Sequence, residues 1–526
     1  MQKQSPKYLA LLTLLLSACA SQNTLPPAAE TDPGTAESEP VLSNSTLLTA
    51  TQSTAVRTPD FWAGLRAGFM LPDLDNSTVA QHRNWYIRHP EYLERVAERA
   101  QQYAWYISRE IRKRGMPAEI ALLPIVESAY DPFAYSHGRA AGLWQFIPAT
   151  GKHFGLRQDW WYDGRRDIVD STRAALDYLE YLHKRFDGDW LLALAAYNSG
   201  EGTVSNAQRK NRKKGKPTDF SHLDLPRETR NYVPKLIALK QLVAAPDHYG
   251  VELTSIASQP YFEVVDTDTQ IDLAVAADLA GIAIDALYRL NPGFNQWATA
   301  PEGPHRLLIP VAQLDVFRQA IAALPAEQRL KWHRHKVSNG ETLSHIAKRY
   351  NTTVSALKVA NDLGGHSIRA GSHIMVPLSS QEPGNYQLSA GQRLNDRQNQ
   401  ARRGQKIQHR IGAGDTLWDL SRHYKVGVRK LAAWNGMAPG DTLRLGQKLV
   451  LWIDQSGASG SAHPGDQLRA VHYTVRQGDS LSAISSRFKV SVTDLRKWNG
   501  LTKGKYLQPG QRLKLYVNVT QQTSGA

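Results

Sequence analysis

Cysteine is almost absent from this chain, because Cys19 is the only one among its 526 residues. A single thiol cannot form a disulfide within the chain. The sequence also has no cluster of His, Cys and carboxylate residues at metal-ligand spacing, and no glycine-rich loop of the kind that cradles phosphate. We therefore expect no metal site and no cofactor.

Long apolar runs are equally scarce. The one marked run covers residues 8–16, and it is too short to span a bilayer stably. Lys3 and Lys7 precede it, which is the charge order of an export signal. The run ends in Leu-Ser-Ala followed by Cys19, and this tetrapeptide resembles the lipoprotein box of bacterial envelope proteins.

The lipoprotein resemblance implies that residues 1–18 are a signal peptide and that Cys19 becomes the acylated first residue of the mature chain. Several acyl chains would anchor the protein to a membrane far more firmly than one. Ala20 in place of Asp implies an outer-membrane lipoprotein of the bacterial cell envelope, facing the periplasm. The alternative is an ordinary cleaved signal with an incidental thiol.

Acidic residues are few in the C-terminal part of the chain. Residues 331–526 hold 29 Lys and Arg against 11 Asp and Glu, a formal charge of +18, whereas residues 1–330 carry −3. Such a charge indicates either an anionic partner or a solvated basic surface. Because the export signal separates the chain from nucleic acid, we expect no nucleic-acid partner.

The length of the chain predicts several domains rather than one core. Residues 19–57 are rich in Ser, Thr, Ala and Pro, so we expect a disordered tether with a coil span on the order of 35 Å. Residues 58–250 place apolar residues at three- and four-residue steps without strand-like alternation, which predicts a predominantly α domain. The expected helices cover 90–114, 116–127, a segment from its cap Asp170 to 182, 190–197 and 232–243.

The rest of the chain is repetitive. Segments 334–378, 407–452 and 471–517 share a Gly followed at fixed spacing by Leu, an aromatic residue, Val, Leu and Asn. The first and last of these aligned positions are Gly340 with Asn361, Gly414 with Asn435, and Gly478 with Asn499. Each segment predicts a small βααβ unit and resembles the LysM module, which implies binding of N-acetylglucosamine-containing glycans such as peptidoglycan.

A weaker fourth copy covers residues 258–311. It keeps Leu287 and Asn291 in register, but Gln270 stands where the other copies have Gly. We expect a degenerate LysM-like unit with a structural role. Residues 379–406 and 453–470 are polar or rich in Gly and Ser, and we expect flexible linkers there.

Glu127 stands at the end of an apolar run, residues 120–126. Glycosidic cleavage needs an acid that stays protonated near neutral pH, and apolar surroundings would raise the pKa of Glu127 for that role. Most glycosidases add a second carboxylate, but no other acidic residue here has comparable neighbours. The candidates are Asp131, Asp167, Asp170 and Glu201. Taken alone, Glu127 is better interpreted as a solvated carboxylate at a helix end.

Four motifs change that interpretation. They are Glu127-Ser128, Gly142-Leu143-Trp144-Gln145, Ala196-Tyr197-Asn198 and Tyr232-Val233. Their order and approximate spacing resemble the family 1 lytic transglycosylases over residues 110–240. The resemblance implies a multidomain protein: a predominantly α catalytic domain with a goose-type-lysozyme-like fold, followed by small α+β LysM modules. Trp144 departs from the Met of many relatives, and we expect it to alter a wall of the cleft.

The resemblance also implies a reaction with one carboxylate. Glu127 protonates the oxygen between N-acetylmuramic acid and N-acetylglucosamine, then accepts a proton from the C6 hydroxyl, which attacks C1 to leave a 1,6-anhydro end. An intramolecular nucleophile makes a second carboxylate unnecessary. Tyr232 would orient Glu127, and Gly142 would let the backbone approach the sugar. The implied cleft residues are Ser128, Gly142, Leu143, Gln145, Phe146, Tyr197, Asn198 and Tyr232.

Two other functions stay open from the sequence. A goose-type muramidase would use Glu127 to add water to the same bond. A non-catalytic wall anchor would use only the LysM repeats and the lipid on Cys19. The sequence does not indicate the oligomeric state, nor the preference for chain ends over internal bonds.

Overall fold

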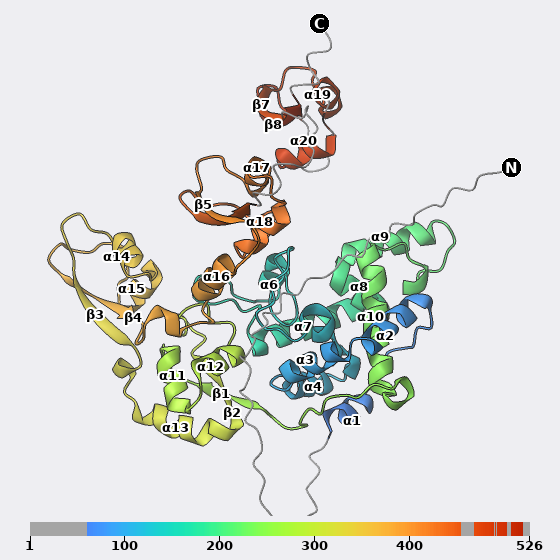
Figure 1. Cartoon of the computed structure of the whole chain (residues 1–526), viewed down its shortest axis with the longest axis horizontal. Coiled ribbons are helices and arrows are strands. Elements are labelled where there is room, and N and C mark those ends of the chain that lie inside the picture. Colours follow the sequence, from blue (N-terminus) through green and yellow to red (C-terminus); the bar gives the residue numbers. More distant parts are fainter. Residues whose placement is uncertain (1–59, 454–467, 489, 491, 502–506, 519–526) are drawn as a thin grey trace, which may run out of the picture. The chain divides into compact units, whose positions relative to one another are not determined.

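A computed structural model of the chain describes residues 60–453, 468–488, 490, 492–501 and 507–518 (Figure 1). The predicted signal peptide, Cys19 and the predicted tether therefore lie outside the described residues, as does most of the predicted linker at 453–470. Within the described residues, no helix combines the length and apolar character needed to cross a membrane.

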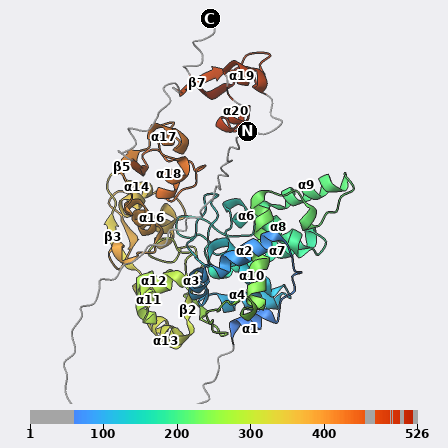
Figure 2. The same cartoon turned by 45° about the vertical axis from the view of Figure 1, so that its right-hand side comes forward.

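The first domain is helical and packs around one apolar core. Its central helix is α10 (Arg227–Ala244), and α2 (Ser77–Ile87) lies along it (Figures 1 and 2). The predominantly α domain expected from the sequence is thus confirmed. The remaining helices are α1 (Phe61–Arg66), α3 (Pro90–Ala100), α4 (Ala104–Lys113), α5 (Leu123–Ser128), α6 (Pro148–His153), α7 (Ile168–Arg185), α8 (Trp190–Ser199) and α9 (Glu201–Arg212).

Several helix boundaries differ from the sequence prediction. The helix expected over 116–127 is a 3-10 helix at Ala118–Leu122 followed by α5, and α10 begins at Arg227 rather than at residue 232. The single helix expected over 90–114 is divided at residues 101–103, where buried Tyr103 donates its hydroxyl to the carbonyl of Arg289 at 2.8 Å. The cap of α7 is Asp167 rather than Asp170, because the Asp167 carboxylate accepts the Asp170 N–H at 2.7 Å. The division at residues 101–103 coincides with a contact remote in sequence, which local periodicity does not report.

A small α+β unit follows the helical domain. Its strands β1 (Phe262–Asp266) and β2 (Arg306–Pro310) pair antiparallel around α11 (Leu273–Ala280) and α12 (Ile284–Leu290), with α13 (Leu314–Ala323) after them. Trp161 and Tyr162 of the helical domain share its apolar cluster, and Asp163 N–H donates to Gly293 O at 2.8 Å. The degenerate copy is therefore packed directly against the helical domain.

Three further units have the expected βααβ order, which confirms the LysM-like repeats. Each has one antiparallel strand pair and its own apolar cluster. Their elements are β3 (Lys331–Lys336), α14 (Leu343–Arg349), α15 (Val354–Ala360) and β4 (His373–Leu378); β5 (Gln405–Arg410), α17 (Leu417–His423), α18 (Val428–Trp434) and β6 (Lys448–Ile453); and β7 (Leu468–Thr474), α19 (Leu481–Phe488), α20 (Val492–Trp498) and β8 (Arg512–Asn518).

The repeated Asn has one structural role in all four copies. The side-chain amide of Asn435 donates to the carbonyls of Leu431 and Val450, both at 2.8 Å, and its oxygen accepts the Val450 N–H at 2.7 Å. Asn291 makes the equivalent bonds with Leu287 and Leu308. The Asn thus joins the second helix to the last strand, which explains why the degenerate copy retains it.

The segment predicted as a linker at 379–406 contains a helix, α16 (Ala390–Asn399). Ser389 caps it, and the Ala390 N–H donates to the carbonyl of Asn295 at 2.8 Å. Arg393 places its guanidinium over the ring of Phe133, 4.4 Å from the ring centre. A polar composition alone did not predict this helix, because these contacts lie far away in the sequence.

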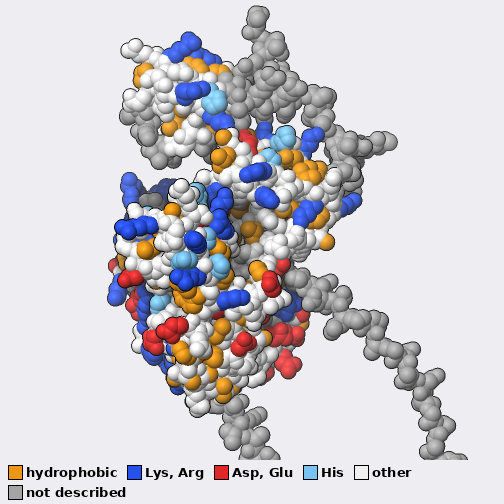
Figure 3. Space-filling view, turned by 90° about the vertical axis from the view of Figure 1, so that its left-hand side faces the viewer, with side chains coloured by type: hydrophobic (Ala, Val, Ile, Leu, Met, Phe, Trp, Pro, Cys, Tyr) orange, Lys and Arg blue, Asp and Glu red, His pale blue; other side chains and the backbone are white. Residues whose placement is uncertain are grey.

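The surface charge follows the imbalance seen in the sequence. On the face shown in Figure 3, Lys and Arg side chains are scattered across the upper part, and Asp and Glu side chains gather mainly in the lower part. The basic surface is thus made of dispersed cations.

Candidate active site

Glu127 lies near the C-terminal end of α5, a helix of six residues that has Pro124 in its first turn. The helix ends at Ser128 and is followed by Ala129, whose left-handed φ of 51° turns the chain away from the helix axis. Leu123 and Ile125 are buried in the core, so the short helix is fixed in place. Its end holds the Glu127 side chain only partly exposed to solvent.

The Glu127 carboxylate has one hydrogen-bond partner among the described residues. Tyr232 of α10, itself 6% exposed, donates its hydroxyl to Oε1 at 2.5 Å. Burial raises the pKa of Glu127 to about 7, against the opposing effects of the Tyr232 hydrogen bond and the charge of Lys235. This geometry agrees with the orienting role expected for Tyr232. Because Oε2 has no hydrogen bond to a described residue, it is available to a substrate.

Ser128 and Gln145 hold the loop beside Glu127 in shape. The Ser128 hydroxyl lies within hydrogen-bond distance of two carbonyls, Pro124 O at 3.1 Å and Leu143 O at 3.0 Å. The Gln145 amide nitrogen donates to Gly142 O at 2.8 Å, and its backbone has a φ of 48°. Both side chains are partly exposed, so both can still contact a ligand beside Glu127.

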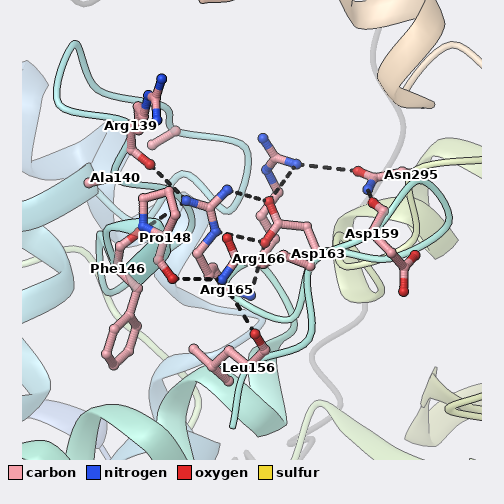
Figure 4. A network of polar contacts seen from close by, with 12 residues as sticks. Arg139, Ala140, Phe146, Pro148, Leu156, Asp159, Asp163, Arg165, Arg166 and Asn295 are labelled. Carbon is pink, nitrogen blue, oxygen red and sulfur yellow. Dashed lines mark hydrogen bonds and ion pairs between the residues drawn. The ribbon is translucent and has the colours of Figure 1, made fainter. Parts of the chain in front are cut away.

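Arg165 supports the same loop from its buried side (Figure 4). Its guanidinium donates to both oxygens of Asp163, at 2.9 and 2.8 Å, and to Arg139 O at 2.7 Å, just before the loop. Burial opposes ionisation of Asp163, but Arg165 and Arg166 outweigh it and lower its pKa. This ion pair is a second support of the site that the sequence analysis missed.

Position 142 must be a glycine, because the backbone of Arg165 lies directly against it. Its φ is +79°, and an added Cβ would lie 2.1 Å from the carbonyl oxygen of Arg165. The need for glycine therefore comes from close contact with the Arg165 backbone, whereas the sequence analysis attributed it to a sugar.

Three side chains of the expected cleft wall are buried. Leu143 and Trp144 have no exposed surface, and Phe146 is 3% exposed. The Trp144 ring nitrogen donates to the Thr172 hydroxyl at 3.0 Å. Trp144 thus fills the core, so the expectation that it alters a wall of the cleft was wrong, and Leu143 and Phe146 act through packing.

Tyr197 and Asn198 lie at the end of α8, where both are partly exposed. The Tyr197 hydroxyl donates to Trp144 O at 2.8 Å, so this ring fixes the loop as well as facing the site. The Asn198 side-chain oxygen accepts from the Thr229 hydroxyl at 2.8 Å, which leaves its amide nitrogen available.

The four carboxylates considered as partners of Glu127 are engaged elsewhere. Asp131 accepts the Phe133 N–H, Asp167 and Asp170 pair with Arg306, and Glu201 pairs with Arg185. Within the described residues, none of them hydrogen-bonds to Glu127.

Two charged residues of α10 affect Glu127 and were not singled out in the sequence. The charge of Lys235 lowers the pKa of Glu127, and that of exposed Glu228 raises it. Their spacing from Tyr232, four residues before and three after, was the available signal, because such residues share one face of a helix.

Family models match most of the described chain. A transglycosylase SLT domain matches residues 105–220, and a LysM-like domain of the lytic transglycosylase MltD matches 261–326. The LysM domain matches 335–377, 409–452 and 473–515. A curated protein of Escherichia coli (strain K12), membrane-bound lytic murein transglycosylase D, is 34% identical over 97% of this chain and 98% of its own length. The chain belongs to the membrane-bound lytic murein transglycosylase D family.

Other known proteins are similar to smaller regions of this chain. A putative tributyltin chloride resistance protein of Alteromonas sp. (strain M-1) is 49% identical over 25% of this chain and 66% of its own length. A solved structure of an inactive variant of the lytic transglycosylase Slt from Pseudomonas aeruginosa is 26% identical, covers 28% of this chain and 24% of that one, and has a TM-score of 0.21. That structural match covers too little of either chain to bear on the mechanism.

Proposed function

We propose that this protein is a peptidoglycan lytic transglycosylase. It cleaves the β-1,4 bond between N-acetylmuramic acid and N-acetylglucosamine without adding water and leaves a 1,6-anhydro end. The observation that carries this proposal is Glu127: burial raises its pKa to about 7, one tyrosine orients it, and no described carboxylate hydrogen-bonds to it.

In the first step, protonated Glu127 donates its proton to the glycosidic oxygen as the bond to C1 breaks. An acid with a pKa near the working pH suits this role, because it can both give and take a proton. Tyr232 holds Oε1, so Oε2 is the oxygen left to carry the proton to the substrate. The acetamido group of the muramyl sugar helps to stabilise the positive charge that develops at C1.

In the second step, the Glu127 carboxylate accepts the proton of the C6 hydroxyl of the same muramyl sugar. The C6 oxygen then bonds to C1 and closes the 1,6-anhydro ring, which returns Glu127 to its protonated form. The Tyr232 hydrogen bond stabilises the carboxylate between the two steps. Because the nucleophile belongs to the substrate, proximity replaces a second carboxylate.

The protein works in the cell envelope, where its three LysM repeats bind the glycan strands that it cuts. The finer placement we propose is an outer-membrane lipoprotein that faces the periplasm, with the lipid on Cys19. The Leu-Ser-Ala sequence before Cys19 and the following Ala20 support this placement.

Mass spectrometry of digested sacculi tests the proposal. Products lighter by one water than the hydrolytic ones, with no new reducing ends, are expected; reducing muramic acid ends would instead establish the muramidase. Glu127→Gln keeps the shape of the side chain and removes the acid, so it should release almost no soluble glycan. Release by this variant equal to that of the parent would show that the assignment of Glu127 as the catalytic acid is wrong, and absence of release by the parent itself would leave the wall-anchor function.

A further inference from the structure

Lys235 occupies a distinctive place on α10. Residues four and three apart share one face of a helix, so Glu228, Tyr232 and Lys235 form one stripe. Since Tyr232 reaches Glu127 at 2.5 Å, this stripe forms a wall of the active site, and Lys235 lies about one turn beyond the tyrosine. Neither the LysM-based targeting nor the acid–base steps use Lys235.

The ammonium group of Lys235 lacks a hydrogen bond or an ion pair with any described residue. Lys240, five residues later on the same helix, shows the usual arrangement for a cation in a protein interior: it donates to Leu71 O at 2.6 Å and pairs with Asp73 at 3.0 Å. Lys235 is only partly exposed, so its charge is neither paired nor fully hydrated.

The neighbours of Lys235 do not neutralise it during the reaction. Burial lowers the pKa of Lys235, and only Glu127 opposes that effect; Glu127 must be protonated when it acts as the acid. On the other side, α2 contributes His82, whose ring nitrogen lies 3.3 Å from the Asn231 side-chain oxygen. Burial lowers the pKa of His82, and the positive charge of Lys235 lowers it further.

We propose that Lys235 binds a carboxylate of the peptide stem carried by the glycan strand, and that it selects strands with anionic stems. The inference rests on the proposed function, because a peptidoglycan substrate is what would bring a peptide carboxylate to this site. A carboxylate at Lys235 would stabilise the charged ammonium and form a charge-assisted hydrogen bond in partly dehydrated surroundings. The partly exposed ammonium of Lys235 is reachable by a ligand.

A double comparison of enzyme charge and substrate charge tests this role. The full-length parent, Lys235→Met and Lys235→Arg are assayed on soluble glycan fragments with native stems, and on the same fragments after their stem carboxylates have been converted to amides. Lys184→Met, which removes a charge from an exposed position on α7, is the matched control.

Lys235→Met should lower kcat/KM on native fragments roughly tenfold, the size expected for one charged hydrogen bond. On amidated fragments, the parent and Lys235→Met should agree within about twofold, because the carboxylate that Lys235 binds is gone. Lys235→Arg should retain most of the preference for native stems, and Lys184→Met should match the parent. Each variant is compared with itself on the two substrates. A smaller fraction of folded enzyme therefore lowers both kcat/KM values equally and leaves their ratio unchanged.

Three outcomes would overturn the role of Lys235. They are an equal loss on both substrates at the pH optimum of each variant, which would mean action through Glu127, no loss on either substrate, or a larger loss on the amidated fragments than on the native ones. If the parent itself forms no anhydro-ended product from native fragments, the proposed function fails instead, so the two failures are distinguishable.

Discussion

The two largest effects on the carboxyl group of Glu127 oppose each other. Burial disfavours its charged form, and the Tyr232 hydroxyl favours that form through a 2.5 Å hydrogen bond. Burial is the larger effect, so the pKa is raised to about 7. The balance gives one side chain both states that the reaction needs at neutral pH.

The raised pKa of Glu127 makes a prediction about stability. Below about pH 4.5 the group is protonated in both the folded and the unfolded chain, so it has no pH-linked effect there. Between about pH 4.5 and 7 the unfolded chain releases the proton first, and the folded state loses stability. Glu127→Gln should therefore raise the free energy of unfolding at pH 8 by on the order of 1–3 kcal/mol, with no gain at pH 4. Thermal unfolding at the two pH values checks this, and an equal change at both would contradict it.

Tyr232→Phe isolates the opposing effect. Loss of the hydroxyl removes the donor that stabilises the Glu127 carboxylate, so the pKa of Glu127 should rise. The alkaline limit of activity should then move to higher pH, while the maximal rate falls by roughly tenfold or more. A pH profile of kcat/KM measures both effects. An unchanged alkaline limit would show that the hydrogen bond does not control the acid.

At the scale of elements, the loop at 142–145 depends on a buried support. Arg165 reaches the backbone on both sides of the loop, at Arg139 O and Phe146 O, and Ser128 and Tyr197 bond to its carbonyls. Arg165 therefore holds the loop from its buried side, and Ser128 and Tyr197 hold it from the side of the site. These contacts fix the loop beside Glu127.

Gly142→Ala tests the close contact behind this loop. The new Cβ would meet the Arg165 carbonyl at 2.1 Å, and the φ of +79° disfavours alanine as well. We expect a loss of roughly 2–4 kcal/mol in the free energy of unfolding, with a large drop in activity. Gly202→Ala is the control, because nothing lies within 4 Å of its added Cβ, and it should not destabilise the protein. Similar behaviour of the two variants in chemical denaturation would disprove the account of the loop.

Much of this element structure was predictable, and the exceptions share one cause. The repeats were visible because their spacing is fixed by local packing and by an Asn that joins helix to strand, as at Asn435. The break before α4, the buried Trp144 and helix α16 depend on partners far away in the sequence, such as Arg289 for Tyr103. In the site, Glu127 and Tyr232 were identified from motifs, whereas Lys235 and Arg165 needed the three-dimensional contacts.

At the scale of the whole molecule, catalysis and wall binding belong to different parts of the chain. The helical domain holds Glu127, and the three LysM repeats lie in the segment that carries a formal charge of +18. Dispersed cations attract an anionic polymer over a range set by the Debye length, which falls from about 10 Å at 0.1 M salt to about 3 Å at 1 M.

The binding of the protein to the wall should therefore depend on the salt concentration. Raising the salt concentration from 0.1 to 1 M should weaken binding of the full-length protein to sacculi several-fold, because the basic surface is screened. Sedimentation with sacculi, using Glu127→Gln to prevent digestion, measures this binding. Binding that does not change with salt would show that the basic surface has no part in holding the wall.

The most direct test of the central claim is digestion of sacculi by the parent protein in ¹⁸O-labelled water. If Glu127 drives ring closure by the C6 hydroxyl, the muramyl ends will be anhydro and will carry no label. Incorporation of one ¹⁸O at each new muramyl end would contradict the account, because it would mean that water, and not the substrate's own hydroxyl, attacks C1.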